Sequence, residues 1–265
     1  MTLERGRTFL DRMTAWSPPK ISINALKLIG AVLTALYFFS IAVVQNGILH
    51  IFDYTDQQQL IDLFAQNEEA AMWGNVSTIL FLAGMVGMPI FAYLLVQGVE
   101  HTSNIQRYIL TVFVFAVVSE PLYDLAMFNR PWSWAEQNSL WTVFISLVML
   151  WLMKTFQSRG TGIVPVLLNI VFLAAGCFMA MLIRCKFGGG FVLMVAILYL
   201  LRERKNVSYW VGALEGLLYY SAPLGFIPVA LCSGVRREKG KWSKYAYYAF
   251  YPIMMAVFAL WVRFI

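Results

Sequence analysis

The amino-acid sequence predicts an all-α protein, a bundle of helices that crosses a membrane about eight times. Three observations support this fold class. Of the 265 residues, 60% are hydrophobic and 13% are charged, whereas soluble domains carry about 25% charged residues. The apolar residues form runs close to the length of about 20 that a membrane-spanning helix needs. The basic residues stand in short clusters between these runs, which is typical of loops that set membrane topology.

Eight apolar runs are candidate spans, and no linker between them is long enough to separate two domains. The sixth run is short and opens with the glycines Gly188 to Gly190. The seventh contains Pro223 and Pro228, so we expect it to be broken or re-entrant. The runs cover approximately residues 25–45, 75–97, 108–128, 139–156, 163–184, 188–202, 208–232 and 245–264. We therefore expect a single transmembrane helical domain over residues 21–265.

Residues 1–20 precede the first run, and we expect them to form an interfacial segment on the cytoplasmic side rather than a cleaved signal peptide. Apolar residues alternate there with Arg5, Arg7 and Arg12. The segment 46–72, in contrast, is acidic and contains no Lys or Arg. Because cytoplasmic loops carry the excess of Lys and Arg, the N-terminus should be cytoplasmic and the acidic loop outside.

The basic segment RREKGKWSK, residues 236–244, conflicts with eight full crossings, which would place it outside. If the segment 208–232 re-enters without crossing, or crosses twice, this basic stretch returns to the cytoplasm. The number of crossings in the second half of the chain is therefore left open by the sequence.

Several classes of function are disfavoured by composition and motifs. The formal net charge is +6, but the basic residues do not line one polar face, so we expect no nucleic-acid partner. The three cysteines show no CxxC spacing and no nearby histidine, so no metal site is expected. Neither a Ser-His-Asp order nor a phosphate-binding glycine loop is present. The lipid bilayer is the first expected partner.

Ionisable residues within or beside the runs are candidate functional residues, because a charge inside a span is costly unless it faces protein or water. Glu120 and Asp124 lie one helical turn apart and share a face, as acid/base chemistry can require. The alternative is that both are hydrated near the outer interface. Glu100 and His101 end the second run, either as a titrating pair or as solvated interfacial residues. Lys27 opens the first run and can snorkel to the headgroups.

Five segments together resemble the TraX family, membrane proteins associated with N-acetylation of conjugative pilin in bacteria. They are LKLIGAVLTAL (26–36), GMPIFAYLLVQGVEHTSNIQRYI (87–109), PLYDLA with the following Asn138 and Thr142, FGGG with LYLLRERK (187–205), and KYAYYAFYP (244–252). The resemblance covers most of the chain. It implies a multi-pass protein of the bacterial cytoplasmic membrane that transfers an acetyl group from cytoplasmic acetyl-CoA to a peptide or pilin amine. On this resemblance, Lys27 and Asn138 are the predicted acetyl-CoA-binding residues.

The chain departs from the family pattern where the proton carriers are expected. The resemblance implies an Asp-His pair late in the first span, but the matching residues are Tyr37 and Phe38. The histidine expected after the terminal Tyr-Pro is also replaced. Neither Phe38 nor Ile253 and Met254, which follow the terminal Tyr-Pro, can relay a proton, which argues against ordinary family chemistry.

Three hypotheses follow from the sequence. The first is an acyltransferase whose acid/base groups have moved to Glu100, His101, Glu120 or Asp124. The second is a non-catalytic relative that binds a peptide, a lipid or a partner protein during assembly. The third is a small transporter or flippase. A water-filled cavity at residues 37 and 38 would favour catalysis, whereas an aromatic-packed interior would favour the non-catalytic hypothesis.

Overall fold

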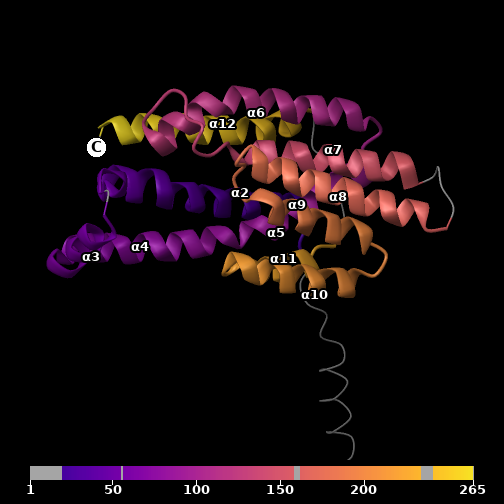
Figure 1. The fold of residues 1–265 in the computed structure, drawn as a ribbon, viewed down its shortest axis with the longest axis horizontal. Helices are drawn as coiled ribbons and strands as arrows, with labels where there is room; N and C mark the ends of the chain where they lie inside the picture. Colours follow the sequence, from indigo (N-terminus) through magenta and orange to yellow (C-terminus); the bar gives the residue numbers. More distant parts are fainter. Residues whose placement is uncertain (1–19, 55, 158–161, 234–240, 265) are drawn as a thin grey trace, which may run out of the picture.

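A computed structural model describes residues 20–54, 56–157, 162–233 and 241–264, and the chain is helical almost throughout these ranges (Figure 1). In chain order the elements are α2 (Ile23–Phe39), η1 (Ser40–Ile48), η2 (Ile51–Asp53), α3 (Gln57–Gln66), α4 (Glu68–Met85), α5 (Gly87–His101), α6 (Ile105–Phe128), α7 (Ser139–Gln157), α8 (Val164–Leu182), α9 (Gly188–Leu200), α10 (Lys205–Gly216), η3 (Leu217–Tyr219), η4 (Ala222–Gly225), α11 (Phe226–Ala230) and α12 (Lys241–Phe264). The predicted all-α fold class is confirmed. The interfacial segment 1–20 and most of the basic segment 236–244 lie outside the described residues.

Within the described residues, six helical stretches are long and apolar enough to cross a membrane, and α9 is a shorter apolar helix. Two of the six stretches are composite. In one, α2 continues into the π-helix η1, so that Ile23–Ile48 forms one stretch. In the other, α4 continues into α5 through Val86, near Pro89, which lacks the amide hydrogen that a straight helix would use.

The seventh apolar run, residues 208–232, was predicted to be broken or re-entrant, and in the structure its helix is broken. Residues 205–230 form α10, two short 3₁₀ turns and α11 instead of one long helix. Tyr220 has a positive φ of 54°, and Pro223 stands at the start of the second turn. These features interrupt the helical hydrogen bonds, so this segment does not form one straight crossing. Where the sequence showed eight runs, the described residues therefore form six long candidate spans, one shorter apolar helix and one broken segment.

The interior contains two large apolar clusters. The first is built chiefly from α5, α7 and α9. The second joins the later part of α2 to α6 and α12, and it contains Tyr37 and Phe38. Figure 1 shows α6 and α12 side by side along one edge of the bundle, with α10 and α11 at the opposite edge. The peripheral helix α8 leaves apolar side chains such as Ile170 and Met181 exposed, as a lipid-facing helix does.

Candidate functional sites

A central polar cluster lies between α6, the start of α7 and the turn before α9. We define it as Glu120, Asp124, Glu136, Asn138 and Lys186. The helix α6 ends at Phe128, and the next residue, Asn129, has a φ of 52° that turns the chain back toward the bundle. The connection that follows brings Glu136 and Asn138 against α6 and the turn before α9. This fold-back explains why charged residues so far apart in sequence meet.

Both carboxylate oxygens of Glu120 accept hydrogen bonds from the protein. Its Oε2 accepts hydrogen bonds from the Nδ2 of Asn138 at 2.5 Å and from the indole Nε1 of Trp141 at 2.6 Å. Its Oε1 accepts from the backbone N–H of Asn138 at 3.3 Å. The same Asn138 side chain also donates to the carbonyl of Ala116. Glu120 therefore fastens the start of α7 to α6, which is what a structural carboxylate does.

Asp124 is fully buried and only partly satisfied. Its Oδ2 accepts a hydrogen bond from the backbone N–H of Ser133 at 2.8 Å. Its Oδ1 has no hydrogen-bond partner within the described residues. This side chain anchors the fold-back connection with one oxygen and leaves the other free.

Glu136 and Lys186 form the one ion pair of this cluster, with Nζ to Oε1 at 2.9 Å and Nζ to Oε2 at 3.1 Å. The phenol of Tyr123 also donates to Glu136. Burial lowers the pKa of Lys186, but the nearby Tyr37 and Glu136 raise it by more, so the pKa lies above its usual value. Lys186 therefore stays charged at neutral pH.

Tyr37 and Phe38 occupy the positions where the resemblance implied an Asp-His pair, and both are packed among rings. Phe38 has no exposed surface, and its ring meets Tyr123 and Tyr251 edge to face at centroid distances of 6.1 and 5.6 Å. The Nζ of Lys186 lies 5.6 Å from the centroid of the Tyr37 ring. Aromatic edge-to-face contacts are favourable and fill space. This is the aromatic-packed interior that the non-catalytic hypothesis predicts.

A cavity of about 420 Å³ lies elsewhere, between α5, α9 and α10. We call it the α5–α10 cavity, and Glu100, His101, Arg202, Lys205 and Ser208 are among the residues that line it. Glu100 pairs with Arg202 at 3.3 Å. The Nδ1 of His101 lies 2.8 Å from the carbonyl oxygen of Gln97, which can only accept. The hydrogen of a neutral His101 is therefore on Nδ1, which leaves Nε2 as a free acceptor.

The predicted catalytic residues thus fall into two places. Glu100 and His101 line the α5–α10 cavity, whereas Glu120 and Asp124 belong to the central polar cluster. The predicted cofactor-binding residues are also on different elements. Lys27 lies over the ring of Tyr247 on α12 at 5.1 Å, and Asn138 is fixed to α6.

Sequence reasoning missed Glu136, Lys186 and Ser208. Glu136 stands in a polar connection that reads as an exposed loop. Lys186 stands in the short turn between α8 and α9, two residues after Arg184, and only the fold shows that this turn reaches the middle of the bundle. The signal in the sequence that could have identified Lys186 is its position as a basic residue in a very short turn between two apolar runs.

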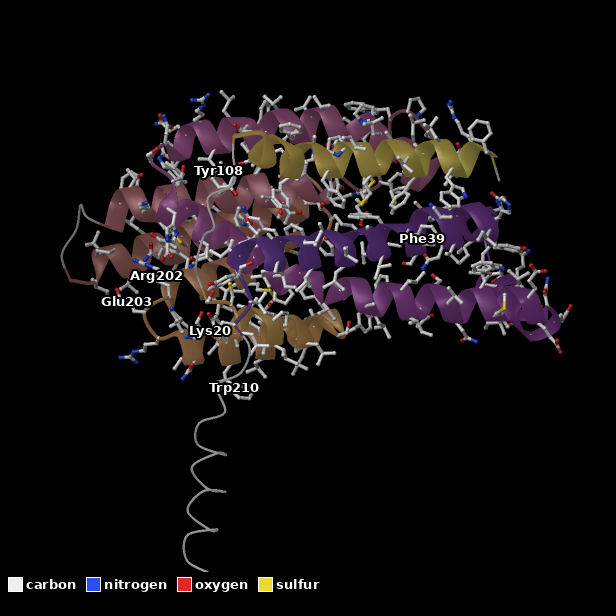
Figure 2. All side chains as sticks on the ribbon, turned by 180° about the vertical axis from the view of Figure 1, so that it is seen from behind. Lys20, Phe39, Tyr108, Arg202, Glu203 and Trp210 are labelled. Carbon is white, nitrogen blue, oxygen red and sulfur yellow. The ribbon has the colours of Figure 1, made fainter. Side chains whose placement is uncertain are left out.

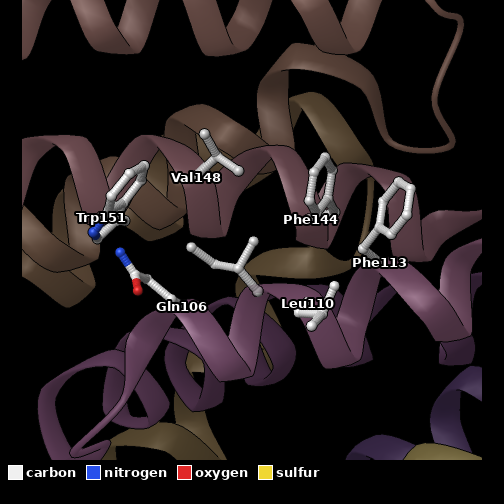
Figure 3. A pocket seen from close by; sticks show the side chains of 7 residues that line it. Gln106, Leu110, Phe113, Phe144, Val148 and Trp151 are labelled. Carbon is white, nitrogen blue, oxygen red and sulfur yellow. The ribbon is translucent and has the colours of Figure 1, made fainter.

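A second, smaller hollow of about 200 Å³ lies on the outer face between α6 and α7 (Figure 3). Its walls are apolar apart from Gln106, and they include Phe113, Phe144 and Trp151. Such a groove on an exposed face suits a lipid chain. Within the described ranges, with their gaps at 55, 158–161 and 234–240, no group of three or more His, Cys, Asp or Glu side chains is placed to hold a metal ion.

The long apolar helices around a buried charged cluster define a multi-pass membrane protein. The chain belongs to the TraX protein family, which matches residues 22–262. It is also 24% identical over 206 residues to the probable fimbrial assembly protein FimC, serogroup H1, of Dichelobacter nodosus, an alignment that covers 66% of this chain and 79% of that protein. No solved structure matches the chain.

Proposed function

We propose that this chain is a non-catalytic TraX-family protein of the bacterial cytoplasmic membrane that acts as a binding partner in pilin or fimbrial assembly. The observation that carries this proposal is the packing of Tyr37 and Phe38. Phe38 is fully buried against Tyr123 and Tyr251, and neither of the two hollows described above is lined by it. Acyl transfer needs a base within hydrogen-bond reach of the reacting amine, and a phenylalanine supplies none.

The central polar cluster supports the same proposal. Both oxygens of Glu120 and both oxygens of Glu136 accept hydrogen bonds from groups of the protein itself. Carboxylates engaged in this way hold elements of the fold together. The relative named as a probable fimbrial assembly protein supports a pilin-type subunit as the partner.

The N-terminus is placed on the cytoplasmic side in this proposal. Lys20, Arg202 and Glu203 lie toward one end of the bundle in Figure 2, and α3, which belongs to the acidic segment 46–72, lies at the other. Arg202, Arg204 and Lys205 give the first end an excess of basic residues. Such an excess favours the cytoplasmic side.

The proposal is tested in the host bacterium by deleting the gene and following two properties of the pilin. Deletion should reduce the amount of assembled pilus while leaving the acetylation state of the pilin amine unchanged by mass spectrometry. The variant His101→Gln should restore assembly as fully as the wild type. Loss of pilin acetylation on deletion, restored by the wild type but not by His101→Gln, would show instead that the chain is an enzyme.

Acetyl transfer is the second candidate, because His101 lines a cavity that also contains basic residues. In that case acetyl-CoA would bind in the α5–α10 cavity and the free Nε2 of His101 would take the proton of the acceptor amine. Purified protein in proteoliposomes would then acetylate a peptide amine from acetyl-CoA, at a rate that falls about 10²- to 10⁴-fold in His101→Gln. Equal background rates for the two proteins would exclude this candidate.

A further inference from the structure

The first turn of α10 is an uncapped helix start at the edge of the α5–α10 cavity. The helix begins at Lys205 and has 12 residues, and its N-cap residue, Arg204, makes no side-chain capping bond. The first amide groups of a helix have no partner within the helix, and the helix dipole adds partial positive charge there. Such a start attracts an anion. Alone this feature does not define a site.

Ser208, one turn further along α10, supplies an independent observation. It lines the cavity and is 2% exposed, yet its hydroxyl has no hydrogen-bond partner among the described residues. Leaving a buried hydroxyl unpaired is costly, so such groups are nearly always satisfied. An oxygen atom of a bound ligand would satisfy this one.

The charges around the cavity indicate the sign of the ligand. Lys205 lines the cavity and makes no ion pair or hydrogen bond with other described residues. Arg202 is paired with Glu100 at 3.3 Å and stacks on the ring of Tyr199 at 4.4 Å. Arg202 and Lys205 outnumber Glu100, so these charged residues leave the lining with a net positive charge. An anion is therefore favoured over a cation.

We propose that the α5–α10 cavity binds a phosphate group at the first turn of α10, with Lys205 and the Ser208 hydroxyl as its principal partners. The phosphate oxygens accept from the Lys205 ammonium, from the Ser208 hydroxyl and from the free amides of the helix start. Two sources have this chemistry, the headgroup of an anionic phospholipid and a soluble phosphate compound such as coenzyme A. The site does not depend on whether the chain transfers acetyl groups.

The surroundings of α10 fit the phospholipid source. Trp210 and Leu214 are 78% and 69% exposed on the outer face of the same helix. Arg202, Lys20 and Trp210 lie toward the same end of the bundle (Figure 2). Basic pockets next to lipid-exposed helices on the cytoplasmic side hold anionic headgroups.

The test is a titration of the protein in phosphate-free detergent with three probes: phosphatidylglycerol, coenzyme A and inorganic phosphate. The melting temperature should rise with the concentration of at least one probe. Lys205→Ala and Ser208→Ala should each weaken that binding by about tenfold or more, as expected for losing a hydrogen bond to a charged group. The control is Arg107→Ala, which removes one positive charge from an exposed side chain on α6 that does not line the cavity.

The outcomes separate the two sources and also test the site itself. A response to phosphatidylglycerol alone assigns a lipid headgroup, and a response to coenzyme A with inorganic phosphate assigns a soluble ligand. Without ligand, Ser208→Ala should melt no lower than the wild type, because its hydroxyl has no partner to lose. No response to any probe, or an equal weakening in Arg107→Ala and Lys205→Ala, would overturn the proposal.

Discussion

Glu120 and Asp124 are neighbours on one helix face, but their hydrogen bonds predict different losses of stability on amide substitution. Both oxygens of Glu120 accept from N–H groups, so the NH₂ of Glu120→Gln would face a donor. We expect this variant to lose about 1–3 kcal/mol of stability. In Asp124→Asn the NH₂ can take the position of the unpartnered Oδ1 while the amide oxygen still accepts from Ser133.

We therefore expect Asp124→Asn to stay within about 0.5 kcal/mol of the wild type. Thermal unfolding in detergent, followed by circular dichroism, measures both variants. Equal destabilisation of the two would contradict the different roles assigned to the two carboxylates.

The ion pair between Lys186 and Glu136 predicts a specific pH dependence. Glu136 is 32% exposed at its side chain, so solvent screens the pair and Lys186→Met should cost only about 1–2 kcal/mol. The pKa of Lys186 is raised above its ordinary value of 10.5 in the folded protein. A raised pKa contributes stability that is complete below the unfolded pKa and is lost as the pH rises through the folded pKa.

The difference in unfolding midpoint between wild type and Lys186→Met should accordingly be constant from about pH 6 to about pH 9 and shrink only at higher pH. Midpoints measured across this range check the expectation. A difference that already disappears near neutral pH would mean that Lys186 is not the charged partner of Glu136.

At the level of elements, α4 packs on α2 through a glycine. A Cβ added at Gly84 would lie 2.4 Å from the Cβ and 2.6 Å from the Cα of Tyr37, closer than real contacts allow. Because the obstacle is backbone, α2 and α4 must separate in Gly84→Ala, and we expect a loss of about 1–3 kcal/mol. The matched control is Gly216→Ala on α10, where the nearest atom would be 3.4 Å away.

Gly216→Ala should be neutral or slightly stabilising, since alanine favours a helix over glycine. Unfolding temperatures of the two variants give the comparison. A tolerated Gly84→Ala would contradict the close approach of α2 and α4 at Tyr37.

The elements themselves were largely predictable from the sequence, and their departures have local causes. Apolar run length located the long helices, because the bilayer sets that length. A break in the run 208–232 was also predicted from Pro223 and Pro228, because proline cannot continue helical hydrogen bonds, and the structure breaks the helix within residues 205–230. The π-helix at Ser40–Ile48 was not, because its residues read as an ordinary apolar helix.

For the whole molecule, the candidate sites were much less predictable than the fold. The sequence identified Glu100, His101, Glu120 and Asp124, but it could not show that the fold separates them into two places. The partners of the central polar cluster come from a fold-back connection and a short turn. Such long-range contacts leave no periodic signal in a single sequence, whereas helix spans do.

The central claim is that the interior at Phe38 is closed to water and therefore cannot house acid/base chemistry. The most direct test is the variant Phe38→Cys in a chain whose three native cysteines are replaced by alanine, exposed in membranes to a small water-soluble thiol reagent. A Glu203→Cys variant, at an exposed residue, serves as the accessible control. We predict that Cys at position 38 stays unmodified until the protein is unfolded, while the control reacts at once. Modification of position 38 in the folded protein at a rate close to that of the control would contradict the account.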